Sequence, residues 1–220
     1  MTLSLSEVGP GLQQEYQAFA DLIRSLSDEE WRTPTRCEGW STGDVAAHVI
    51  GTLTDVVNGN LADLGTPETI ARQVEERRGR SPEQLAEELE ASGKVAADMV
   101  GSFSDELWEM PAPPGVEGTL GWGVEALWYD TVVHADDIRT AVGRSSQPGP
   151  GIRAAVSHVA IELEKRNWGP ATLALEGVEE FPVGSGEGSR VTGDAWQFVL
   201  AATGRADGAP FNDVPNIYAD

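Results

Sequence analysis

Two histidines and one aspartate have the spacing of a metal site. Asp130 and His134 are four residues apart, which places a carboxylate and an imidazole on one face of a helix. His48 lies more than 80 residues earlier in a second helical pattern, on the same face as Val45 and Val49. If the two helices pack together, two nitrogens and one oxygen converge, as in a catalytic metal site with an open position. The spacing leaves a second interpretation, in which both histidines are buried hydrogen-bonding residues without a metal.

The helices that must position these residues can be located from apolar periodicity and capping signals. Ser41 with Asp44 starts the helix that carries His48, and Gly143 ends the helix that carries Asp130 and His134. Ser81, Pro82 and Glu83 start another long helix, whose inner stripe we expect to be Leu85, Leu89, Val95 and Met99. The predicted helices cover residues 11–27, a segment from 41, a short segment from 66, 81–103 and 120–142. Four main helices joined by moderate loops predict an up-and-down bundle.

The pattern changes near residues 147–151, where two prolines and two glycines predict a domain boundary. Beyond it we expect a helix over 152–166, a strand over 171–175 and a last helix over 193–203. The glycine-rich segment 184–188 resembles a hairpin turn, and the tail 206–220 should be irregular. The sequence therefore predicts a mainly α protein, with a four-helix bundle in residues 1–147 and a small α+β domain in residues 148–220.

The residues around the histidines match a known pattern. The first stretch follows W..PT.C.GW...D..AH, with Trp31, Pro34, Thr35, Cys37, Gly39, Trp40, Asp44 and His48 in place. Together with the later stretch 134–143, it resembles the mycothiol-dependent maleylpyruvate isomerase family of the DinB-like metalloprotein superfamily. The resemblance covers residues 10–145 with specific motifs and extends more weakly through residues 191–205.

The resemblance implies a DinB-like four-helix bundle, a divalent metal and a thiol cosubstrate. The family binds its metal through a histidine of the first motif and a Glu-x-x-x-His pair of the second, which here correspond to His48, Asp130 and His134. The chain departs from the family at Asp130, whose side chain is one methylene shorter than glutamate. We expect zinc first, although nickel and iron accept the same ligands. The resemblance also implies that an arginine of the C-terminal domain holds a substrate carboxylate, and Arg205 is our candidate.

Mycothiol, a low-molecular-weight thiol, would supply the sulfur nucleophile, since metal coordination favours the thiolate. Addition to an electrophilic alkene followed by elimination would isomerise a small-molecule substrate, and addition alone would be S-transfer. The sequence is also compatible with two other functions. One is a metal-dependent enzyme that uses bound water or the substrate without a thiol. The other is a non-catalytic metal-binding or interaction protein that keeps the bundle.

The composition limits which partners the protein can bind and where in the cell we expect it. The formal charge of −21 argues against binding to nucleic acid or an anionic membrane, since either polyanion would be repelled. A single cysteine excludes an internal disulfide framework and any cysteine-based zinc module. The sequence shows no signal peptide and no apolar stretch long enough for a membrane span, so we expect a cytoplasmic protein.

Several other polar or aromatic residues need an interpretation. Cys37 is interpreted as a small buried hydrophobic residue rather than a nucleophile. Asp44 and Asp137 could each fix the tautomer of a neighbouring histidine, or could be a helix cap and a solvated charge. Glu125 lies nine residues before His134, about 900° of helical rotation, so it should point away from the site. Trp40 and Trp122 are expected in the core or the pocket wall, and we assign His158 no role.

Overall fold

The computed structural model describes residues 3–219, which form two compact units. Residues 4–147 make up the first unit, and residues 148–219 together with Leu3 belong to the second. The fold is mainly α, with one small sheet. Within the described residues, no helix combines the length and the hydropathy that crossing a membrane requires.

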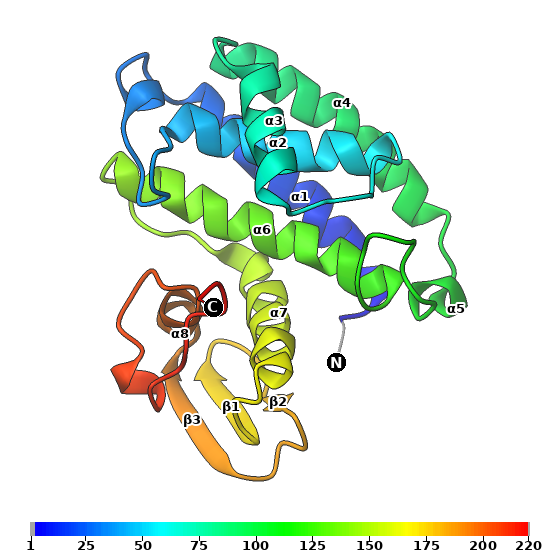
Figure 1. The fold of residues 1–220 in the computed structure, drawn as a ribbon, viewed down its shortest axis with the longest axis vertical. Helices are drawn as coiled ribbons and strands as arrows, with labels where there is room; N and C mark the ends of the chain where they lie inside the picture. The colour runs from blue at the N-terminus through cyan, green and yellow to red at the C-terminus, as the bar shows by residue number, and fades with distance from the viewer. Residues whose placement is uncertain (1–2, 220) are drawn as a thin grey trace. The chain divides into compact units, whose positions relative to one another are not determined.

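Four long helices build the first unit (Figure 1). Helix α1 packs against α4 and α6, and α2 packs against the same two helices from the other side. The short helix α3 covers α2, and a 3-10 turn, η1, also lies against α2. The bounds are α1 Leu5–Arg24, η1 Glu30–Arg32, α2 Thr42–Val57, α3 Pro67–Arg77, α4 Pro82–Gly101, α5 Asp105–Trp108 and α6 Leu120–Ala141.

The predicted capping signals position the helix starts. Ser41 and Asp44 form a reciprocal capping box at α2, and Ser81 forms one with Gln84 at α4. Gly143 follows α6 with a φ of 71°, the left-handed conformation of a helix stop. Helix α1 starts six residues before the predicted residue 11, because Val8 is fully buried and extends the packed face.

The predicted inner stripe of α4 is right for its first half and wrong for its second. Leu85 and Leu89 are buried, but Val95 and Met99 are 45% and 40% exposed. The buried positions continue instead through Gly93 and Ala96. These small residues face α1, and an ideal Cβ on Gly93 would lie 3.6 Å from the ring of Tyr16. The ring of Tyr16 on α1 therefore packs beside small residues of α4, a contact that hydrophobicity alone does not indicate.

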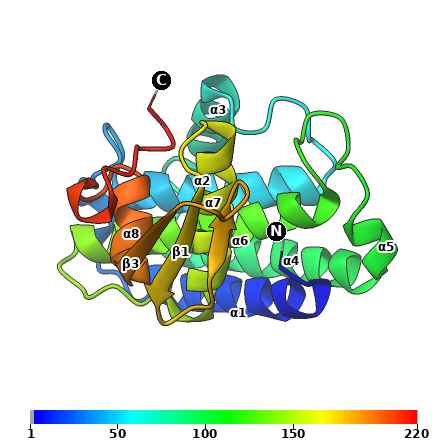
Figure 2. The same ribbon diagram turned by 90° about the horizontal axis from the view of Figure 1, so that it is seen from below.

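The second unit combines two helices with a three-stranded sheet. The strand order is β2-β1-β3, with β2 antiparallel and β3 parallel to β1. Helix α7 packs against β2, while α8 packs against β1 and β3, and Figure 2 shows both helices behind the sheet. The bounds are η2 Gly149–Gly151, α7 Ile152–Lys165, β1 Ala171–Glu176, β2 Phe181–Val183, β3 Ser189–Asp194, α8 Ala195–Ala202 and η3 Ala209–Phe211.

The glycine-rich segment 184–188 is not a hairpin turn, which corrects the sequence prediction. It joins β2 to β3, which flank β1 on opposite sides and do not pair with each other. The segment crosses the end of β1, where Thr172 donates its hydroxyl to the carbonyl of Gly186 at 2.6 Å. Gly188 has a φ of 153°, and a Cβ there would lie 2.2 Å from the carbonyl oxygen of Pro170. The glycine thus serves a close backbone approach rather than a turn.

Candidate metal centre

The first unit brings His48, Asp130 and His134 together. Helix α2 carries His48, and α6, which packs against it, carries the other two. The Oδ1 atom of Asp130 lies 3.7 Å from Nε2 of His48 and 3.4 Å from Nε2 of His134. The two imidazole rings meet edge to face, with centroids 5.1 Å apart. The predicted convergence of two nitrogens and one oxygen is therefore present.

Hydrogen bonds define which nitrogen of His48 carries a proton. Its Nδ1 lies 3.2 Å from Oε1 of Gln73, a buried residue of α3. The amide of Gln73 cannot turn over without losing a bond, because its Nε2 donates to Oδ2 of Asp55 at 2.7 Å and a carboxylate only accepts. Nδ1 of His48 is therefore the donor, and its Nε2 presents a lone pair toward Asp130.

His134 is fixed in the same tautomer by a different partner. Its Nδ1 lies 2.8 Å from Oδ2 of Asp137, a fully buried carboxylate one turn along α6. Because the carboxylate can only accept, Nδ1 donates, which leaves Nε2 as the ring atom that faces Asp130.

The Nε2 atoms of the two histidines and Oδ1 of Asp130 thus face one another. The ligand atoms of the three residues all lie within 4.8 Å of one another. Ligands about 2.0–2.2 Å from a tetrahedral metal are separated by about 3.3–3.5 Å, close to the two distances that Asp130 makes. The donor set therefore fits a divalent transition metal, and the shorter side chain of Asp130 reaches far enough.

Without a metal, a proton would take the same position. Burial lowers the pKa of His134, but Asp130, together with the hydrogen bonds that His134 makes with Asp137 and Cys37, raises it well above the usual value. Burial would raise the pKa of Asp130, yet His134 and His48 lower it well below its usual range. The centre is therefore built to hold positive charge, either a proton or a metal ion.

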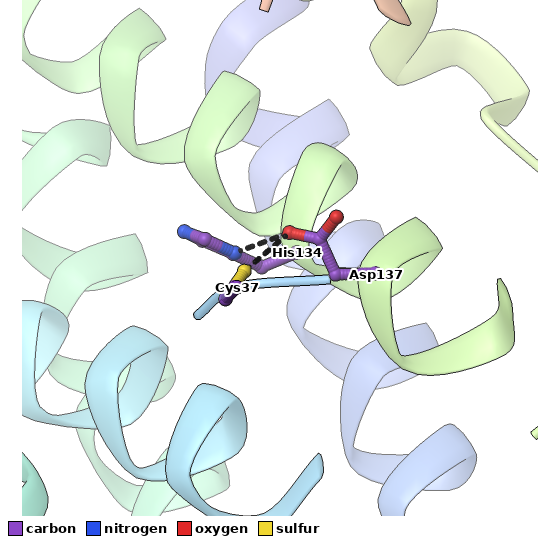
Figure 3. A group of neighbouring side chains, drawn as sticks. All are labelled: Cys37, His134 and Asp137. Atoms are coloured by element: carbon purple, nitrogen blue, oxygen red, sulfur yellow. Dashed lines mark hydrogen bonds and ion pairs between the residues drawn. The ribbon is translucent and has the colours of Figure 1, made fainter. Parts of the chain in front are cut away.

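A second group of possible ligands adjoins the first but differs in chemistry. Figure 3 shows Cys37 beside His134 and Asp137. The Sγ atom of Cys37 lies 3.3 Å from Oδ2 of Asp137, the atom that also accepts from His134. The other carboxylate oxygen accepts from Nε of Arg36 at 2.5 Å. This carboxylate therefore accepts from Arg36, Cys37 and His134, and the group forms a hydrogen-bonded cluster that orients His134.

The family model of the mycothiol maleylpyruvate isomerase N-terminal domain matches residues 12–139, more than half of the chain. The chain belongs to this family.

Solved structures show the same fold. Two structures of the mycothiol-dependent maleylpyruvate isomerase, one of them a variant with a histidine replaced by alanine, match with a TM-score of 0.63. Each match covers 93% of this chain and 90% of that chain at 17% sequence identity. At this identity the likeness establishes the mainly α, DinB-like fold. No curated protein sequence matches the chain.

Within this family member, the two aspartates left open by the sequence have different roles. Asp137 hydrogen-bonds to His134, as described above. Asp44 instead completes the α2 cap, where its Oδ2 accepts from the amide and the hydroxyl of Ser41 at 2.9 and 2.6 Å. The interpretation of Cys37 as a small hydrophobic residue was wrong, because this half-buried thiol donates to a carboxylate.

The aromatic and remaining candidates also have defined positions. The ring of Trp40 lies 5.3 Å from that of His48, centroid to centroid, so this tryptophan forms part of the wall of the site. Glu125 is fully buried on α6, and its carboxylate is not one of the ligand atoms that lie close together at His48, Asp130 and His134. Arg205 belongs to the second unit, where its Nη1 donates to the carbonyl of Thr203 at 3.2 Å. Its role toward a substrate therefore stays a prediction.

Proposed function

We propose that this family member is a metal-dependent isomerase that uses mycothiol to act on a small electrophilic substrate. The observation that carries the proposal is the close approach of three possible ligand atoms, from His48, Asp130 and His134. The family match and the similar solved structures of the mycothiol-dependent maleylpyruvate isomerase support the thiol and the reaction class. Zinc is the metal we propose, because two imidazoles and one carboxylate form a common zinc ligand set.

The side chains of the site would control charge and orientation. A divalent metal bound there would supply a Lewis acid and lower the pKa of a coordinating thiol. Two neutral imidazoles and the carboxylate of Asp130 offset one of its two charges. Asp137 and Gln73 keep the imidazoles turned so that both Nε2 atoms face the site. The ring of Trp40 covers one side of His48 and would limit the access of water.

The proposed reaction requires no nucleophile from the chain. Mycothiol, when bound, would supply a thiolate for reversible addition to a conjugated alkene of the substrate. Addition followed by elimination would isomerise the double bond, and addition followed by protonation would be an S-transfer.

Arg205 is our proposed anchor for a substrate carboxylate, since a guanidinium offers two parallel donors to a carboxylate. Replacement of Arg205 with lysine keeps the charge but loses the fork. We expect Arg205→Lys and Arg205→Ala to raise KM for a carboxylate-bearing substrate much more than they lower kcat. Unchanged KM in both variants would show that Arg205 does not bind the substrate.

The cytoplasmic location of the protein remains a prediction.

Elemental analysis tests the metal first. We expect about one equivalent of a transition metal in the wild-type protein and loss of it in His134→Ala. His158→Ala is the matched control, because His158 is a buried histidine on α7, outside the helical unit that carries the centre. Metal-free protein, even after reconstitution with zinc, would overturn the proposal. With metal present, equal turnover with and without mycothiol would instead favour the enzyme that uses water or the substrate alone.

A further inference from the structure

Helix α3 contributes one buried polar side chain to the surroundings of His48. Its sequence is mostly polar, and only Gln73, Val74 and Arg77 are buried. Gln73 approaches α2 at Gly51, where an ideal Cβ would lie 2.6 Å from the Cβ of Gln73. Any larger residue at position 51 of α2 would push α3 away from α2. The close contact between the two helices is therefore built around Gln73.

The amide of Gln73 belongs to a chain of hydrogen bonds with a fixed direction. Arg72 donates from Nη2 to Oδ2 of Asp55 at 2.6 Å, and Nε2 of Gln73 donates to the same oxygen at 2.7 Å. At its other end, the Oε1 atom accepts from His48 and from the hydroxyl of Thr52, each at 3.2 Å. Asp55 thereby determines that Gln73 presents an acceptor, and not a donor, to the imidazole.

Ion pairs hold α3 in place for this contact. Arg77 donates from Nη1 to the backbone carbonyl of Gln73 at 3.0 Å and from Nη2 to Glu88 of α4 at 2.6 Å. Thr54 of α2 donates to the same Oε1 atom of Glu88 at 2.9 Å. Because Arg77 and Gln73 are both buried, these bonds are shielded from solvent. The position of the Gln73 amide is thus set by both neighbouring helices.

We propose that Gln73, oriented by Asp55, is the positioning residue that holds His48 as its Nδ1–H tautomer and so keeps Nε2 available to the centre. If the amide turned over, its NH₂ group would face Nδ1, the proton would move to Nε2, and the site would lose one of its three lone pairs. The proposal rests on the proposed metal site for its affinity readout but not for its tautomer readout.

The tautomer can be read directly from the imidazole nitrogens. Nitrogen-15 NMR of the metal-free protein distinguishes a nitrogen that carries a proton from one that carries a lone pair, and His48→Ala assigns the signals among three histidines. We expect the wild-type His48 to show Nδ1–H alone. In Gln73→Met, which keeps the length but has no hydrogen-bonding group, we expect both tautomers and a zinc affinity about 10- to 100-fold weaker.

Two further variants separate positioning from folding. Gln84→Met makes the same substitution at the α4 capping box, so it should lower stability without changing the tautomer or the zinc affinity. The double variant Gln73→Glu with Asp55→Asn reverses the bond between positions 55 and 73 but still offers His48 an acceptor. We expect this variant to keep Nδ1–H, and it provides the test if Gln73→Met fails to fold.

The outcomes are distinct. A single Nδ1–H tautomer and unchanged zinc affinity in Gln73→Met would overturn the proposal, as would mixed tautomers in the folded double variant. A tautomer that becomes mixed in Gln73→Met would support the positioning role even if no variant bound zinc, and in that case only the proposed metal function would fail.

Discussion

Asp136 and Asp137 are neighbours on α6 and share one cation, but only Asp137 contacts a histidine of the centre. Arg36 donates from Nη2 to Asp136 at 2.6 Å and from Nε to Asp137 at 2.5 Å. Both carboxylates are buried. Asp137 also accepts from His134 at 2.8 Å. Substitutions at the two positions can therefore measure the effect of losing an ion pair with Arg36 separately from the effect of losing the hydrogen bond to His134.

We expect Asp137→Asn to weaken zinc binding about 10- to 100-fold, since the neutral amide makes the imidazole a poorer ligand. Asp136→Asn loses a comparable buried pair with Arg36 and leaves His134 untouched, so its affinity should stay within a few-fold of wild type. Competition against a chromophoric chelator measures the affinities, and urea unfolding compares the stabilities. Equal affinities in the two variants would show that the bond to His134 has no influence on the metal.

Asp130 replaces the glutamate of the family pattern, and its distances to both imidazoles indicate that it can still bind a metal. We therefore expect Asp130→Asn, which removes the negative charge, to lose most of the zinc affinity. Asp130→Glu should keep measurable zinc binding, because the longer side chain can adjust its torsions. Elemental analysis of both variants after dialysis checks this. Full zinc content in Asp130→Asn would exclude Asp130 as a ligand.

The three central residues could be predicted from the sequence, whereas their supporting residues could not. The i, i+4 spacing and the helical facing of His48 both follow from local periodicity. Gln73 and Arg36, in contrast, lie in polar segments without any pattern that marks an inward side chain. Their roles depend on how α3 and the loop before α2 pack, which is tertiary information. The same reason explains the error at Val95 and Met99, because packing against α1 and α2 determines the buried face of α4.

Cys37 is the single thiol of the chain, and its place beside His134 makes the identity of the nucleophile testable. We expect Cys37→Ser to retain activity within a few-fold when mycothiol is supplied, because the serine hydroxyl can still donate to Asp137. Cys37→Ala should show a modest loss, since Asp137 then loses the thiol as a donor. Steady-state turnover at saturating mycothiol measures this. A loss of 100-fold or more in Cys37→Ser with zinc content intact would make Cys37 the nucleophile.

Glu15 makes the stability of the helical unit depend on pH. This buried residue of α1 accepts a bond from the indole Nε1 of Trp128 at 3.3 Å. Burial raises the pKa of its carboxyl from 4.5 to about 7, against the lowering effects of Trp128 and Arg139. Between these two values the native state keeps the proton and the unfolded state releases it, so the free energy of unfolding falls as pH rises.

Glu15→Gln removes this cost and keeps an oxygen for Trp128. We expect the variant to match wild type near pH 4, below the unfolded-state pKa, and to be more stable by roughly 3 kcal/mol at pH 8, since each unit of pKa shift corresponds to about 1.4 kcal/mol. Urea unfolding in the presence of a chelator, at a series of pH values, measures the difference. Glu87→Gln, an exposed substitution on α4, is the control and should follow the wild-type profile. A constant difference between Glu15→Gln and wild type across this range would mean that Glu15 does not change protonation on unfolding.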